Sequence, residues 1–83
     1  MLASKKQLAC CWHHFRYYAP DPDIFNLPKK EQKRMFLERF NTKNIENITR
    51  YKAHKYIGDI RLEERWSVRD GDLEELKKDW GLK

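Results

Sequence analysis

Residues 10–14 hold the densest group of potential ligands and nucleophiles, in the run Cys10-Cys11-Trp12-His13-His14. Structural zinc sites usually space their ligand pairs by two to four residues and draw them from two segments. Adjacent side chains on a helix point about 100° apart, so one helical turn cannot surround a metal tetrahedrally. At most Cys10 and His14 would bind, with the other ligands from a partner. The pattern therefore predicts two reduced cysteines, two surface or interface histidines and no metal.

The same thiols and imidazoles are weak candidates for nucleophilic catalysis. Such catalysis needs a concave pocket and a third group that orients the base, and a chain of 83 residues has little room for a pocket. The three glycines stand apart at Gly58, Gly71 and Gly81, so no glycine-rich phosphate loop is present. We expect a protein that is not an enzyme, with no catalytic residue, no cofactor and no small-molecule substrate.

Basic residues in the N-terminal half form the candidate nucleic-acid contact. Lys and Arg number 18 against 13 Asp and Glu, a net charge of +5. Cations at a helix start become favourable when a phosphate docks there, and basic surfaces bind RNA through its phosphates. A solvated lysine-rich helix face is the alternative. The candidate residues are Lys5, Lys6, Arg16, Lys29, Lys30, Lys33 and Arg34.

The position of these cations separates two functions. Contact with RNA predicts that they converge on one face of the folded chain. A role in a protein assembly predicts instead that they are dispersed and paired with carboxylates such as Glu31 and Glu38.

Residues 1–19 are predicted to form a basic amphipathic helix. The Ser4-x-x-Gln7 pattern is a capping box, and the helix ends at Ala19-Pro20 because proline disfavours helical geometry in the preceding residue. It contains no acidic residue, which is typical of a mitochondrial presequence. An ordinary amphipathic helix packed on its own domain explains the pattern equally well. Its apolar face comprises Leu8, Cys11, Trp12, Phe15 and Tyr18.

Residues 20–83 are predicted to form a small helical region. Helices are expected over 28–40, over 44–56 with Asn44 as N-cap, and after an Asp72-x-x-Glu75 capping box up to Gly81. Residues 60–66 fit a helix or an extended segment. The helices over 28–40 and 44–56 also fit a helix-turn-helix, although the second helix would then present Glu46 to the DNA. The fold class is mostly α, a small extended arrangement of three to four short helices joined by turns, with little independent core.

Large apolar side chains are spread along the chain, with 13% aromatic residues. The conformational entropy lost on folding costs on the order of 120 kcal/mol, at about 1.5 kcal/mol per residue. A small chain offsets this cost with difficulty, because it buries only ~60% of the surface that its unfolded state exposes. Trp and Tyr are enriched at protein interfaces. The residues assigned to a protein interface are Trp12, Phe15, Trp66, Leu73, Leu76 and Trp80.

Composition excludes several classes of protein. Three glycines and three prolines exclude collagen-like chains, no apolar run is long enough to span a bilayer, and two adjacent cysteines cannot staple a disulfide miniprotein. We expect a non-catalytic structural subunit of a large assembly in the mitochondrial matrix, foremost a mitochondrial ribosomal protein whose partners are rRNA and other subunits. The alternative is a soluble matrix-side accessory subunit of a respiratory-chain complex or ATP synthase. A free-standing nucleic-acid-binding or adaptor domain is the third hypothesis.

Overall fold

The first helix begins where the capping box places it. Ser4 N–H donates to Gln7 Oε1 at 2.9 Å, and Gln7 N–H donates to Ser4 Oγ at 3.2 Å. The computed structural model describes residues 1–17, 24–60 and 70–82. Within them lie four α-helices and two 3₁₀ turns and no named strand, which confirms the mostly α class. The elements are α1 (Lys5–Tyr17), η1 (Ile24–Asn26), α2 (Lys29–Arg39), η2 (Ile45–Asn47), α3 (Arg50–Ile60) and α4 (Asp70–Trp80).

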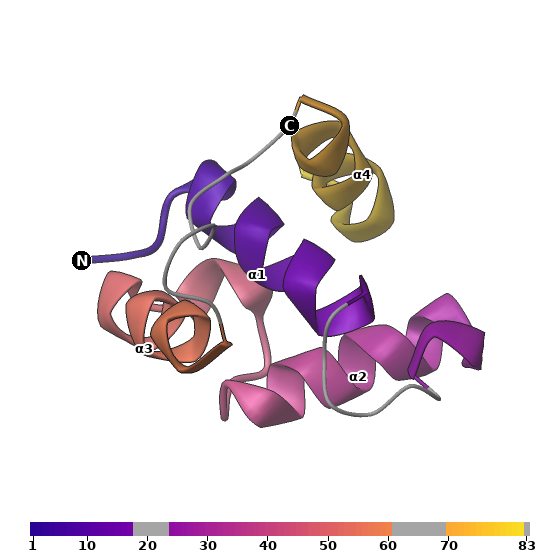
Figure 1. Cartoon of the computed structure of the whole chain (residues 1–83), viewed down its shortest axis with the longest axis horizontal. Coiled ribbons are helices and arrows are strands. Elements are labelled where there is room, and N and C mark those ends of the chain that lie inside the picture. Colours follow the sequence, from indigo (N-terminus) through magenta and orange to yellow (C-terminus); the bar gives the residue numbers. More distant parts are fainter. Residues whose placement is uncertain (18–23, 61–69, 83) are drawn as a thin grey trace.

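Helix α1 runs through the middle of the molecule, with α4 on one side and α2 and α3 on the other (Figure 1). Because α1 has helices packed on both sides, its side chains are buried around much of the helix and not along one face only. Among the described residues it supplies six of the fifteen buried hydrophobic side chains: Leu8, Ala9, Cys10, Cys11, Trp12 and Phe15.

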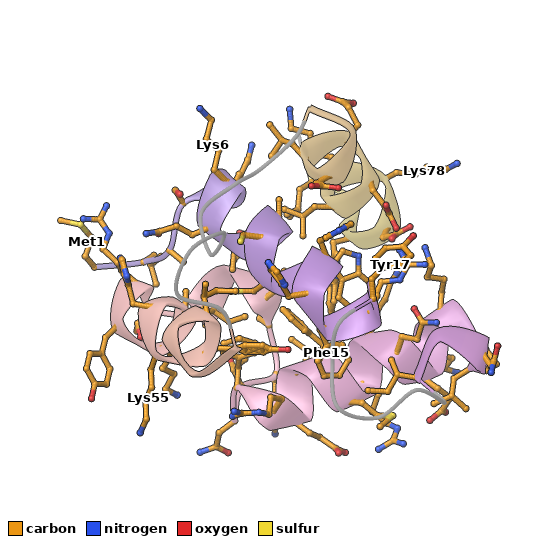
Figure 2. All side chains as sticks on the ribbon, in the orientation of Figure 1. Met1, Lys6, Phe15, Tyr17, Lys55 and Lys78 are labelled. Carbon is orange, nitrogen blue, oxygen red and sulfur yellow. The ribbon has the colours of Figure 1, made fainter. Side chains whose placement is uncertain are left out.

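Trp12 lies at the centre of an aromatic core. Its ring centroid is 5.1 Å from that of Phe36 in α2 and 5.2 Å from that of Trp80 in α4, both edge to face. Phe15 also packs on Phe36, at 5.2 Å, and points inward between α1 and α2 (Figure 2). Edge-to-face rings of this kind stabilise a core beyond the area they bury.

The chain is more compact than the extended arrangement expected from its sequence. Its extents are 28 × 26 × 26 Å and its radius of gyration is 11.6 Å. The difference arises because the scattered aromatic side chains pack against one another inside the chain. No helix among the described residues has the length and apolar character needed to cross a membrane.

The chain before α1 is held by the segment before α3. Ala3 N–H donates to Ile48 O at 2.9 Å, and Arg50 N–H donates to Met1 O at 3.0 Å. Leu2 and Thr49 form an isolated antiparallel bridge between these bonds. The N-terminal residues are therefore part of the fold.

The predicted helix over 44–56 is wrong at both ends. Asn44 caps the short turn η2, since its Oδ1 accepts from Glu46 N–H at 2.9 Å. The backbone is then extended at Ile48, and α3 starts after Thr49, whose Oγ1 accepts from Lys52 N–H at 3.2 Å. Helix α3 also continues beyond residue 56, the expected end, and passes through Gly58 to Ile60.

Helix α4 begins earlier than predicted and ends as predicted. It starts at Asp70, so Asp72 lies in its first turn and is not its N-cap. Gly81 has φ +67°, the left-handed conformation that terminates many helices. Leu82 N–H then donates to Lys77 O at 3.0 Å. The predictions for Tyr18, for Trp66 and for residues 61–66 fall outside the described residues.

Candidate functional site

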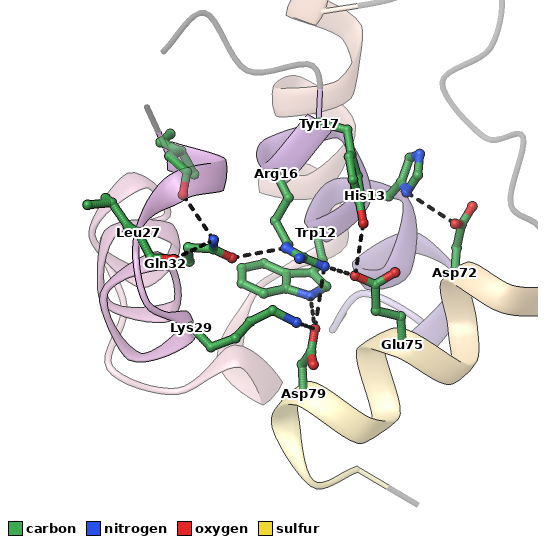
Figure 3. Close-up of polar contacts among 11 residues, drawn as sticks. Trp12, His13, Arg16, Tyr17, Leu27, Lys29, Gln32, Asp72, Glu75 and Asp79 are labelled. Atoms are coloured by element: carbon green, nitrogen blue, oxygen red, sulfur yellow. Dashed lines mark hydrogen bonds and ion pairs between the residues drawn. The ribbon is translucent and has the colours of Figure 1, made fainter. Parts of the chain in front are cut away.

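A partly buried group of polar and charged side chains joins α1, α2 and α4 (Figure 3). We call it the charged cluster: Trp12, Arg16, Lys29, Gln32, Glu75 and Asp79. One carboxylate oxygen, Asp79 Oδ2, accepts from Trp12 Nε1–H at 3.0 Å and from Lys29 Nζ at 2.7 Å. Arg16 Nη1 lies 3.7 Å from the same oxygen. Asp79 thus holds a residue from α1 and one from α2 against α4.

Arg16 is the buried cation of this cluster. Its Nε–H donates to Gln32 Oε1 at 2.9 Å, and its guanidinium pairs with Glu75. The Gln32 Nε2 amide donates in turn to the Ile24 and Leu27 carbonyls, both at 2.9 Å. These partners offset most of the free-energy cost of removing the guanidinium from water. Arg16 can therefore stay charged at the place where α1, α2 and α4 pack together.

The protonation of Asp79 depends on these contacts. Desolvation alone would raise the pKa of its carboxyl group. The hydrogen bonds from Lys29 and Trp12, together with the charges of Lys29 and Arg16, outweigh it and lower that pKa below the ordinary value. Asp79 is therefore ionised at neutral pH, and the cluster holds its ion pairs there.

The predicted RNA-contacting residues do not converge on one open face. Arg16 and Lys29 face the carboxylates of the charged cluster. Arg34 Nη2 lies 2.8 Å from Glu31 Oε2, and its Nη1 lies 2.7 Å from Glu38 Oε1. These two glutamates are the partners that the protein-assembly hypothesis specified.

The remaining four cations of that set lie as two pairs on different helices, Lys5 and Lys6 at the start of α1 and Lys30 and Lys33 on α2. Lys33 Nζ lies 5.5 Å from the ring centroid of Trp80. Lys5 and Lys6 are exposed at the opposite end of α1 from Arg16, and Lys30 is exposed on α2. In Figure 2, Lys6 points away from the body of the molecule.

The predicted interface residues lie mainly inside the chain. Trp12, Phe15 and Leu76 are buried. Leu73 and Trp80 are half-buried against the same core. Among the described residues, the exposed large apolar side chains are different ones: Met1, Leu2, Tyr17 and Tyr51. Periodicity missed them because it does not tell which apolar residues the fold leaves outside.

The cysteine–histidine run has buried thiols and belongs to no metal site among the described residues. Cys10 and Cys11 are buried free thiols. Burial, and then the Asp72 charge, raise the pKa of Cys10 to about 11. Burial raises the pKa of Cys11 even further, so both stay protonated at neutral pH. The described His, Cys, Asp and Glu side chains include no group of three that could hold a metal ion.

The expectation of two surface or interface histidines is only partly met. His14 is buried, because α1 packs on several sides. His13 is half-buried, and its Nδ1 lies 3.1 Å from Asp72 Oδ1 of α4. The His13 imidazole thus takes part in the α1–α4 contact.

A second charged region lies between the end of α2 and the middle of α3. It is a hollow of about 240 Å³, which we call the basic hollow, lined by Arg39, Phe40, Asn41, Lys52, Lys55 and Tyr56. Three of these six residues are cations and none is acidic. The sequence pattern does not reveal the hollow, because Arg39 precedes Lys52 by 13 residues and Lys55 by 16, and meets them only where the end of α2 reaches α3.

Comparisons of the chain with protein-family models, with curated proteins and with solved structures gave no match. The two candidate sites are therefore defined by the positions and charges of their side chains. The charged cluster can hold three helices together, and the basic hollow presents positive charge to a ligand.

Proposed function

We propose that this chain is a non-catalytic structural subunit of a larger mitochondrial assembly and is held there mainly by protein contacts. A soluble matrix-side accessory subunit of a respiratory-chain complex or ATP synthase has this character. The ribosomal hypothesis ranks second, because it needs an open basic face built from the predicted RNA-contacting residues.

The observation that carries this preference is the pairing of those residues with the chain's own carboxylates. Arg16 faces Glu75 and Asp79, and Lys29 faces Asp79. Arg34 pairs with two glutamates on its own helix. A cation that already has an anionic partner gains little from a phosphate, because it must exchange one partner for another.

Exposed apolar side chains offer a docking surface. Met1, Leu2 and Tyr51 are 88%, 56% and 74% exposed. The backbone pairing of Leu2 with Thr49 brings the first two residues next to the start of α3. We call Met1, Leu2 and Tyr51 the apolar edge. Exposed apolar groups of this kind are typical of protein interaction sites.

The mitochondrial part of the proposal rests on the acid-free, basic and amphipathic segment at residues 1–19. In the folded chain residues 5–17 of this segment form the central helix α1. An import receptor would therefore recognise it before the chain folds, and its apolar face would then pass into the core.

The test is native electrophoresis of isolated mitochondria from cells that express the full chain with a C-terminal tag, before and after ribonuclease treatment. We expect the chain in a high-molecular-weight protein complex that survives the nuclease. The double variant Leu2→Ser/Tyr51→Ser should leave that complex while circular dichroism of the purified chain stays unchanged. Lys78→Ser, an exposed change on α4 (Figure 2), is the control and should assemble normally.

Two results would contradict the proposal. Migration with ribosomal particles that ribonuclease disperses would restore the ribosomal hypothesis. Absence of the tagged chain from mitochondria would remove the proposal altogether.

A further inference from the structure

We propose that the basic hollow is a binding site for a single phosphate group, such as a phosphomonoester or a phospholipid headgroup. The proposal rests on the geometry of the hollow and is independent of the proposed function.

The charge of the hollow lacks compensation from within the described part of the chain. Arg39, Lys52 and Lys55 have no carboxylate within ion-pair distance there, whereas Arg16, Lys29 and Arg34 each have one. Three like charges around one hollow repel one another, and a hollow of one sign concentrates the potential that attracts a counter-ion. An anion bound among them would relieve that repulsion.

The two cations nearest the core are held in place by their neighbours. The Arg39 guanidinium carbon lies 5.2 Å from the centroid of the Tyr56 ring. Tyr56 is itself buried and stacks on Phe40, with 5.0 Å between centroids and 10° between planes. Lys52 Nζ donates to the Phe40 carbonyl at 3.2 Å. Groups positioned before binding lose less conformational entropy when a ligand arrives.

The chemistry of the lining matches a phosphate. A guanidinium presents a planar fork of donors that fits phosphate oxygens in bidentate fashion, and lysine adds mobile ammonium donors. Asn41 ends α2 in the left-handed conformation, with φ 52°. Its backbone N–H is already used on Glu38 O at 3.0 Å, so its side-chain amide is the group that can donate to a ligand.

The last α2 carbonyls oppose an anion, since a helix C-terminus carries partial negative charge. Phe40 lines the hollow at this end of α2, and Lys52 already donates to its carbonyl. The C-terminus of α2 contributes about half a negative charge. The three cations of the hollow therefore still give it a net positive charge.

The size of the hollow favours one phosphate over a nucleic-acid strand. Pockets for drug-sized ligands occupy about 300–1,000 Å³, and this hollow is smaller. A strand of RNA needs a basic groove that tracks its backbone. On α2 the next cation toward the N-terminus, Arg34, is paired with two glutamates. The hollow therefore fits a phosphate at the end of a molecule whose remainder stays in solvent.

The experiment is a titration of the isotopically labelled full chain with inorganic phosphate, followed by NMR at constant ionic strength. We expect the Arg39 side-chain N–H and the Asn41 side-chain amide to shift together and saturably. Arg39→Gln should weaken binding about tenfold, the equivalent of ~1.4 kcal/mol. Arg34→Gln removes the same charge from the same helix and is the matched control, because Arg34 already has carboxylate partners; it should bind like the wild type.

A second arm identifies the source of the phosphate. The chain is sedimented with vesicles of phosphatidylcholine that contain or lack phosphatidic acid, which ends in a phosphomonoester. Sedimentation that needs phosphatidic acid and Arg39 indicates a lipid headgroup. Binding of inorganic phosphate without sedimentation indicates a soluble ester.

Three results would overturn the proposal. The first is the absence of any saturable shift at the hollow. The second is an identical response to chloride, which would mean unspecific charge screening. The third is saturable binding of RNA oligonucleotides through Arg39 with no response to inorganic phosphate, which would assign the hollow to a nucleic-acid surface.

Discussion

The charged cluster and the basic hollow use the same kinds of side chains for opposite purposes. In the cluster, Arg16 and Lys29 meet Glu75 and Asp79, and the arrangement joins three helices. In the hollow, three cations line one cavity whose lining contains no acid. The difference shows that a basic residue is a candidate for binding only when the fold leaves its charge without a carboxylate partner. Mutations that affect the two regions differently test this distinction.

The largest effect is expected at Trp12, which belongs to both the aromatic core and the charged cluster. Trp12→Ala removes its contacts with Phe36 and Trp80 and the donor to Asp79. Truncating a buried aromatic residue costs about 3–5 kcal/mol, a large share of the stability of about 4–12 kcal/mol for a chain of this length. We expect most of the cooperative urea transition to be lost.

Trp80→Ala is the comparison, because Trp80 is only half-buried. It should loosen α4 and lower the urea midpoint while leaving a cooperative transition. If Trp12→Ala unfolded at the wild-type urea concentration, Trp12 would not be the centre of the core.

An intermediate effect is expected at Asp79. Asp79→Asn keeps the shape and an acceptor for Trp12, but it removes the charge that faces Lys29 and Arg16. Hydrogen bonds to charged groups contribute about 1.5–3 kcal/mol, so we expect a loss of about 2 kcal/mol in urea unfolding at pH 7. Glu38→Gln breaks an exposed pair with Arg34 and should lower stability much less, because water screens an exposed ion pair.

The same variant should change the dependence of stability on pH. The pKa of Asp79 is lowered in the folded chain, so the unfolded chain binds its proton first as pH falls. The stabilisation is complete above the ordinary Asp pKa of about 3.9 and disappears as pH falls through the lower folded value. Urea midpoints measured from about pH 6 to 2 should fall less steeply for Asp79→Asn. Parallel curves would show that Asp79 has the same pKa in both states.

The smallest effect on stability is expected in the basic hollow. Lys55→Gln removes one of three like charges, so stability should change by less than about 0.5 kcal/mol, with a slight gain at low salt that disappears as screening increases. Lys29→Gln in the charged cluster removes a partner of Asp79 and should cost about 1 kcal/mol. Urea titrations at low and high salt compare the two. Equal losses for both would remove the distinction between the regions.

Several local features follow from short stretches of sequence and were predicted from them. The Ser4–Gln7 capping box and the Gly81 helix end depend on neighbouring residues alone, and the structure confirms both. The predicted start of α3 was wrong. Asn44 caps the turn η2, whereas Thr49 Oγ1 accepts the hydrogen bond from Lys52 N–H at the start of α3. Both residue types are good caps, so the local pattern alone does not choose between them.

The candidate sites depended on contacts between distant segments. Arg16 was assigned to an RNA contact and is buried, because α2 and α4 bring Gln32 and Glu75 to it. Leu76 was assigned to an interface and is enclosed by the chain's own core. The hollow joins Arg39 to Lys55 where the end of α2 meets α3.

By itself, the sequence determined that the chain is mostly helical, where its first helix begins and how its last one ends, since capping and apolar spacing act over a few residues. Only the tertiary structure decided that Arg16 and Lys29 meet carboxylates of α4 and which apolar side chains stay exposed. The physical reason is that Coulomb energies and burial depend on distances in space, and helix packing sets those distances between residues far apart in the chain.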